Sequence, residues 1–297
     1  MREPTDGFVE VGDGELAVAV WPGEPDAPVV LAVHGITASS RAFLALAGAL
    51  PELRIVAPDL RGRARSNGLP AGSGLEQHAA DLRRLLDVIG ADRVTVVGHS
   101  MGAFVATVLA ADEPERVASL VLVDGGFPLA APPGVDTSDP RPVLGPVFER
   151  LAMVFPSRDA YLEYWRRAPA FVREGDWTDE VEAYVRYDLE PADGGFRASA
   201  NADAVTVDQA QLYGSSFHLD ALRSLQQPVT FVRAPRGMQD EPPGLYAPER
   251  LRTCRELVPQ LEVVEVPDVN HYTVLMTAPG VDRVAETVRA AVARSLP

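Results

Sequence analysis

The segment Gly98-His99-Ser100-Met101-Gly102 carries the strongest chemical signal in the sequence, because it matches the pattern G-x-S-x-G. An apolar run at 93–97 predicts a strand before it, and the run at 101–111 predicts a helix after it. So tight a turn strains the backbone of the serine, lifts its hydroxyl above the sheet and places it at the positive end of a helix dipole. The context indicates that Ser100 is a nucleophile, which needs a base to activate it.

Histidine is the side chain best suited to take up that proton near neutral pH. Of the five histidines, His271 is favoured because it follows a predicted strand at 261–266 and precedes a predicted closing helix at 281–296. A loop at the carboxyl edge of a parallel sheet can bring it over Ser100. Of the remaining four, His34 lies at a strand end, His78 in a helix and His218 in a long insertion. His99 lies beside the nucleophile but points away from it.

These residues resemble the α/β-hydrolase family, and the resemblance extends over nearly the whole chain. It implies the order nucleophile, acid, histidine along the sequence, which Ser100 and His271 fit. It also implies that the amides of Ile36, which follows the third predicted strand, and of Met101 form an oxyanion hole. Two such donors stabilise the transition state by a few kcal/mol each, roughly 10²–10³ in rate. The segment 59–62, Asp-Leu-Arg-Gly, is similar to a structural turn of the family.

The family offers two places for the acid that orients the histidine. Asp124 occupies the first, directly after a predicted strand at 119–123 and before two glycines. Asp240 and Glu241 are the candidates for the second, in a loop that is longer than the family's usual turn. We predict Asp124 as the acid and keep Asp240 as the alternative, because a position directly after a strand at the sheet edge fixes a carboxylate best.

The elements that must position these residues alternate between strands and helices along most of the chain. The strand-like runs lie at 8–11, 16–21, 28–34, 54–57, 93–97, 119–123, 228–232 and 261–266. Such alternation predicts an α/β fold, with a mainly parallel, doubly wound sheet. It stops between 127 and 225, where helical segments occur without a clear strand. We therefore predict a core of residues 1–126 and 226–297 with an inserted helical cap at 127–225.

Aromatic residues are concentrated in the predicted cap, which holds 13 of the 20 in the chain. Most are expected to pack the small helical module and its contact with the sheet. A minority are expected to line a substrate pocket, since such pockets are mostly apolar. Phe127, Trp165 and Tyr187 are the candidates.

The formal charge of −15 disfavours binding to nucleic acids and to anionic membranes, because like charges repel. All 27 basic residues are arginine, so there is no lysine for a Schiff base or a phosphate loop. The single cysteine, Cys254, is expected to be structural. No apolar leader or long apolar run occurs, and a cytoplasmic protein that binds a small-molecule substrate is expected. The sequence leaves the oligomeric state open.

No metal-ligand spacing or nucleotide motif occurs, so no metal or cofactor is expected. We therefore predict a serine hydrolase that cleaves an ester, lactone or thioester of a largely apolar small molecule. A cofactor-free haloperoxidase and a carbon–carbon bond hydrolase share the same residues with it. A ligand-binding receptor on a hydrolase scaffold is the alternative of another class.

Overall fold

The computed structural model describes residues 1–70 and 74–295. In this part of the chain eight strands form one sheet, in the order β1-β2-β4-β3-β5-β6-β9-β10. Strands β3, β4, β5, β6, β9 and β10 run parallel to one another. At one edge of the sheet, β2 pairs antiparallel with β4, and β1 pairs antiparallel with β2. The bounds are β1 Thr5–Glu10, β2 Glu15–Trp21, β3 Val29–Val33, β4 Arg54–Pro58, β5 Val94–His99, β6 Val117–Val123, β9 Val229–Arg233 and β10 Leu261–Glu265. The predicted α/β class with a mainly parallel sheet is confirmed.

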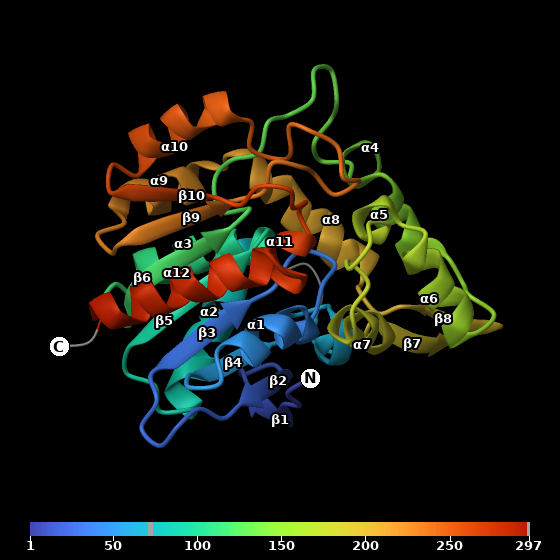
Figure 1. The fold of residues 1–297 in the computed structure, drawn as a ribbon, viewed down its shortest axis with the longest axis horizontal. Helices are drawn as coiled ribbons and strands as arrows, with labels where there is room; N and C mark the ends of the chain where they lie inside the picture. The colour runs from blue at the N-terminus through green and yellow to red at the C-terminus, as the bar shows by residue number, and fades with distance from the viewer. Residues whose placement is uncertain (71–73, 296–297) are drawn as a thin grey trace.

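Helices cover both faces of the sheet (Figure 1). On one face lie α2 Gly74–Val88, α3 Met101–Asp112, α9 Ser216–Ser224 and α10 Leu251–Leu257. On the other face lie α1 Leu44–Ala49, α11 Thr273–Met276 and α12 Gly280–Ser295. The predicted closing helix corresponds to α12, and position 296 lies outside the described residues. Short 3-10 turns η1 Ser40–Phe43, η2 Ala64–Ser66 and η6 Pro248–Arg250 complete the core.

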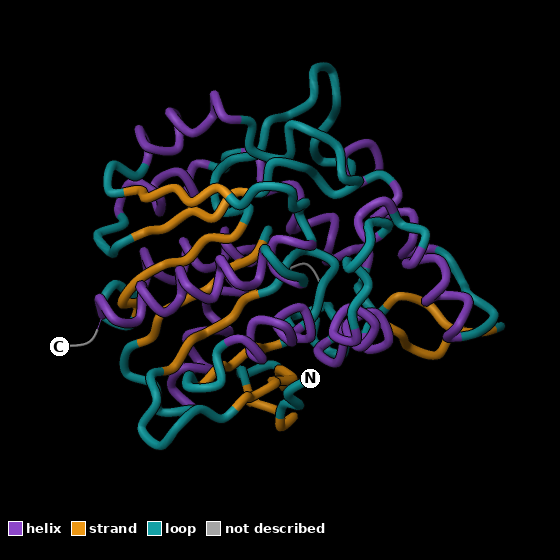
Figure 2. Tube along the Cα trace, viewed as in Figure 1, coloured by secondary structure: helices purple, strands orange, loops and turns teal. Residues whose placement is uncertain are grey.

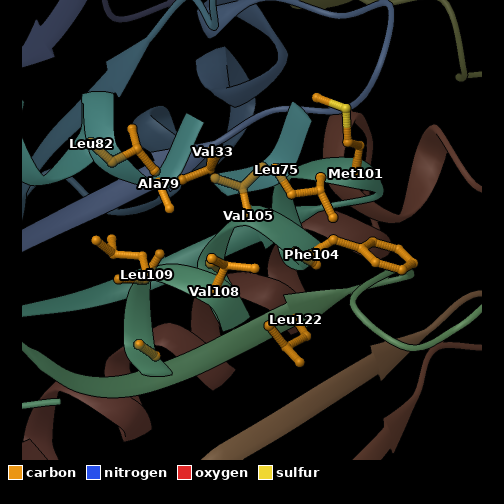
Figure 3. Packing of buried hydrophobic residues seen from close by; sticks show 14 of the residues in the cluster. Val33, Leu75, Ala79, Leu82, Met101, Phe104, Val105, Val108, Leu109 and Leu122 are labelled. Carbon is orange, nitrogen blue, oxygen red and sulfur yellow. The ribbon is translucent and has the colours of Figure 1, made fainter. Parts of the chain in front are cut away.

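The continuous apolar runs of the central strands explain these two layers, because successive side chains point to opposite faces. In β6, Leu120 and Leu122 face the α2–α3 layer, whereas Val121 and Val123 face the α1–α12 layer. Figure 3 shows Leu122 packed with Phe104 and Val108 of α3. Both layers hold the carboxyl ends of the strands in fixed positions.

The segment between β6 and β9 forms most of a separate module, on the right in Figures 1 and 2. Its helices are α4 Arg141–Leu144, α5 Pro146–Glu149, η3 Arg150–Ala152, α6 Arg158–Arg166, η4 Pro169–Phe171, α7 Asp179–Tyr187, α8 Ala202–Ala210 and η5 Gln211–Tyr213. The last helix of the segment, α9, instead packs on α3 in the core layer. His218 of α9 lies 2.9 Å from the Thr107 hydroxyl of α3.

The module also contains a hairpin that the sequence pattern did not indicate, β7 Leu189–Ala192 with β8 Gly195–Ala198. Each strand has only four residues, and one includes a proline, so neither shows a strand period. Gly194, with φ +81°, permits the turn between them. Within residues 1–70 and 74–295, no helix is long and apolar enough to cross a membrane.

Candidate active site

Ser100 lies at the turn between β5 and α3, with φ 53° and ψ −125°. This conformation is strained for a residue with a side chain. Glycine is needed at positions 98 and 102 because the main chain there lies close to other backbone atoms. A Cβ atom on Gly102 would lie 2.0 Å from the Val33 carbonyl oxygen, and one on Gly98 would lie 2.5 Å from the Ala103 Cα atom. The half-buried serine therefore stands at a rigid, tightly packed turn.

His271 and Asp124 meet at the carboxyl edge of the sheet. The distance from His271 Nδ1 to Asp124 Oδ2 is 2.7 Å, and both side chains are buried. Asp124 directly follows β6, and its second carboxylate oxygen accepts a hydrogen bond of 3.2 Å from the Ala234 amide after β9. A buried carboxylate in this position keeps the proton on Nδ1, which leaves Nε2 free to act as a base.

Asp240, the alternative acid, binds arginines instead. Its carboxylate lies 2.6 Å from Arg236 Nε and 2.8 Å from Arg173 Nη2, and it accepts from the Asn270 side chain at 3.2 Å. Burial acts to raise the pKa of Asp240, but the hydrogen bonds from Arg236, Asn270 and Arg173 together lower it. It has no hydrogen bond to His271 within the described chain. Asp240 thus connects the module to the loop after β9.

The loop that carries His271 is held by His99, a contact that sequence reasoning missed. His99 Nε2 lies 2.8 Å from the His271 carbonyl oxygen, and the two ring centroids are 4.7 Å apart. Burial lowers the pKa of His99 to about 3, so the ring is neutral and donates this hydrogen bond. Asn270 adds a second restraint, because its side chain donates to the Ala170 carbonyl oxygen at 2.9 Å. No spacing rule in the sequence indicates either contact.

Ile36 follows a glycine that lies against the serine. A Cβ atom on Gly35 would lie 3.5 Å from Ser100 Oγ. The amide of Met101 opens α3, where the first N–H groups have no partner inside the helix. In the described part of the chain, neither the Ile36 nor the Met101 amide donates to a protein acceptor. Buried Arg63 fixes this loop, since its Nε donates to the Ile36 carbonyl oxygen at 2.9 Å.

The other predicted features are structural in their contacts. His34 accepts a hydrogen bond from the Leu60 amide at 2.8 Å, and burial lowers its pKa to about 3. Asp59 accepts from the Ser40 amide at 2.8 Å. Arg61 is paired with Asp81 at 2.8 Å. Among the residues that are described, no cluster of three His, Cys, Asp or Glu side chains is arranged to hold a metal ion.

A cavity of about 480 Å³ lies between the inserted module and the loops at the sheet edge. Its lining includes Val147, Arg150, Trp165, Ala170, Met238 and Tyr272. Ser100 and His271 are not in the lining, but Tyr272 follows His271, and their ring centroids are 5.7 Å apart. One wall residue of the cavity is therefore in ring contact with the histidine.

Of the three aromatic candidates, only Trp165 lines this cavity. Phe127 is buried against Phe231 in the core, with ring centroids 5.5 Å apart. The Tyr187 hydroxyl donates a hydrogen bond of 2.7 Å to the Asp59 carboxylate, so this residue connects α7 to the core. Both residues lie in contacts between the module and the sheet layer. Their apolar or amphipathic character alone does not tell such a contact residue from one that lines a pocket.

Comparison with known proteins gives consistent results. A sequence model for the alpha/beta hydrolase fold matches residues 28–275. The chain is 29% identical to 2-(acetamidomethylene)succinate hydrolase of Mesorhizobium japonicum over 248 residues, which is 82% of this chain and 82% of the relative. It is 45% identical to Lipase LipV of Mycobacterium tuberculosis over 101 residues, 34% of this chain and only 38% of that relative.

A solved structure supports the same assignment over nearly the full length. The thioesterase domain from a curacin biosynthetic pathway superposes with a TM-score of 0.72 and 26% identity, over 97% of this chain and 99% of that domain. The sheet order, the serine turn after β5 and the family match over 28–275 agree. This chain belongs to the alpha/beta hydrolase fold family.

Proposed function

We propose that the protein is a serine hydrolase that cleaves an ester, lactone or thioester of a small, largely apolar molecule through an acyl-enzyme. The observation that carries the proposal is the hydrogen bond of 2.7 Å between His271 and the buried carboxylate of Asp124. It lies at the sheet edge on which Ser100 also stands. The relatives named as a lipase, a succinate-derivative hydrolase and a thioesterase support hydrolysis of an acyl compound.

In the proposed reaction, His271 Nε2 takes the hydroxyl proton while Ser100 Oγ attacks the carbonyl carbon. Asp124 stabilises the imidazolium that forms. The amides of Ile36 and Met101 stabilise the oxyanion. His271 then returns the proton to the leaving group, and water, activated by the same histidine, releases the acid from Ser100.

The inserted module is proposed as the cap that selects the substrate. It supplies most of the lining of the cavity beside His271, and that lining is mostly apolar. The names of the relatives cover different acyl compounds, so they support the reaction class more closely than any one substrate.

The test combines a fluorophosphonate probe with p-nitrophenyl esters of increasing chain length. Wild-type protein is expected to be labelled at Ser100 and to turn over at least one ester. Ser100→Ala is expected to lose labelling and nearly all turnover while keeping the wild-type melting temperature. Labelling without turnover of any acyl compound points to a receptor on this scaffold. Retention of most of kcat by Ser100→Ala contradicts the mechanism.

A further inference from the structure

Arg150 is a buried cation on the wall of the cavity, and half of its guanidinium is unused. The side chain is 1% exposed and begins the turn η3 of the cap. Its Nη1 lies 2.5 Å from the Asp188 carboxylate and also donates to the Tyr161 hydroxyl. Its Nε and Nη2 atoms are buried and have no hydrogen-bond partner within the described chain.

The partners of Asp188 explain why it leaves this edge of Arg150 free. One carboxylate oxygen of Asp188 binds Arg150 Nη1 and the Tyr161 hydroxyl, and the other accepts from the Ser199 hydroxyl at 2.9 Å. Asp188 is therefore saturated on the Nη1 side. A buried N–H group without an acceptor destabilises the protein, and more so when the group is charged. An acceptor supplied by a ligand removes that destabilisation.

The free edge has the shape that a carboxylate requires. Nε and Nη2 of a guanidinium point in parallel and bind the two oxygens of a carboxylate together. Arg150 is held in place by its ion pair and by stacking on Trp165, with its guanidinium carbon 5.0 Å from the ring centroid. Little side-chain entropy is therefore lost when an anion binds.

The rest of the cavity fits an apolar body attached to that carboxylate. Val147, Ala160, Trp165, Ala170 and Met238 line it. Tyr272 closes the wall on the side of His271. Arg167 and Glu163 also lie on the cavity, but both are exposed and paired with each other at 2.8 Å. Arg150 is thus the buried cation in the lining with donors to spare.

We propose that Arg150 binds a carboxylate group of the substrate, so that the enzyme acts on acyl compounds with an apolar body and one anionic end. The proposal rests on the proposed function, since it treats the cavity as part of the substrate site. It adds a specificity-determining residue in the cap and a chemical class of substrate.

The test uses 3-phenylpropanoate as a probe and 3-phenylpropanamide as its neutral analogue. Both are assayed as competitive inhibitors of p-nitrophenyl butyrate hydrolysis. Arg150→Lys keeps a cation beside Asp188 but loses the paired donors. It is expected to raise the Ki of the propanoate roughly 10–100-fold more than it raises the Ki of the amide or the KM of the ester. Arg223→Met, which removes an exposed arginine of α9 outside the cavity, is expected to change none of these values.

The double variant Arg150→Met/Asp188→Asn removes both charges, so no unpaired carboxylate remains to unfold the cap. It is expected to discriminate no better than Arg150→Lys between propanoate and amide. Unchanged propanoate inhibition in both variants overturns the carboxylate site, and so does inhibition that is not competitive with the ester. If the protein hydrolyses no ester, the proposed function is wrong, but the carboxylate site can still be tested. Calorimetric Kd values of propanoate and amide, measured for wild type and each variant, then replace the Ki values.

Discussion

Asp124 reaches His271 through a single short hydrogen bond, and the residues around it keep it there. The carboxylate is fully buried and accepts from the Ala234 amide, so it cannot turn toward solvent. Gly125, directly after it, passes so close to the serine that an added Cβ would lie 2.1 Å from the Ser100 carbonyl oxygen. Asp124 and Ser100, the proposed acid and nucleophile, are thus held by adjacent backbone turns.

This arrangement predicts different outcomes for two matched aspartate substitutions. Asp124→Asn keeps the shape but removes the charge that fixes the His271 tautomer, and kcat is expected to fall by about 10³–10⁴-fold. Asp240→Asn removes a carboxylate that binds Arg236 and Arg173, and kcat is expected to stay within about tenfold. Steady-state kinetics on one p-nitrophenyl ester compare the two. Equal losses in both variants, or a larger loss at Asp240, contradict the assignment.

At the scale of the element, the prediction from sequence succeeded where the signals are local. The strand, the serine turn and the helix of 93–111 are contiguous, and apolar runs identified the central strands of a fold that is confirmed. The contact of His271 with Asp124 was predicted only as a preference over Asp240. Which loop reaches the histidine depends on packing between β6, β9 and the inserted module, and spacing along the chain does not encode that packing.

Features that depend on contacts across the molecule were missed. The β7–β8 hairpin has strands too short to show a period, and it is stabilised where Phe155 pairs with Phe196. His99 and Arg150 gain their roles from partners 172 and 38 residues away. In the sequence, the first is a neighbour of the serine and the second is one of many arginines.

In the inserted module, residues that line the cavity and residues that anchor the module to the core are expected to respond differently to substitution. Trp165→Leu enlarges the cavity and is expected to shift the preferred acyl chain length and to change relative kcat/KM values by about tenfold. Tyr187→Phe removes only the hydrogen bond to Asp59 and is expected to lower stability by about 1–2 kcal/mol without changing the ranking. A panel of p-nitrophenyl esters and urea unfolding provide the two readouts. If the ranking of esters is unchanged in Trp165→Leu, the cavity does not bind the acyl chain of the substrate.

For the whole molecule, three buried histidines stay neutral in the folded protein at pH values where an unfolded chain protonates them. Burial lowers the pKa of His34 and His99 to about 3 and that of His218 to about 4. All three rings pack between a core strand or helix and a loop or neighbouring helix, so none can be charged without disturbing the core. An unfolded histidine has a pKa near 6.5.

These shifts predict that the protein loses stability as the pH falls below about 6.5. Between that value and the folded-state pKa, the unfolded chain binds a proton that the folded chain does not bind. Each histidine then lowers the free energy of unfolding by up to about 1.4 kcal/mol per pH unit. The stabilisation is complete above pH 6.5 and decreases toward pH 3 for His34 and His99, and toward pH 4 for His218. The excess of acidic residues acts in the opposite direction, because acid reduces their mutual repulsion.

His218→Gln isolates the histidine contribution from that background. The pKa of His218 is lowered by burial alone, and its ring lies between Phe104 and the Thr107 hydroxyl of α3. The variant is expected to be less stable than wild type at pH 7, because glutamine fills the site poorly. Between pH 6.5 and pH 4.5 its free energy of unfolding is expected to decrease less steeply than that of wild type, by up to about 1.4 kcal/mol per pH unit, which is the contribution of one proton. Urea unfolding at half-unit pH intervals measures both curves, and curves that remain parallel mean that His218 takes up its proton in the folded protein as readily as in the unfolded chain.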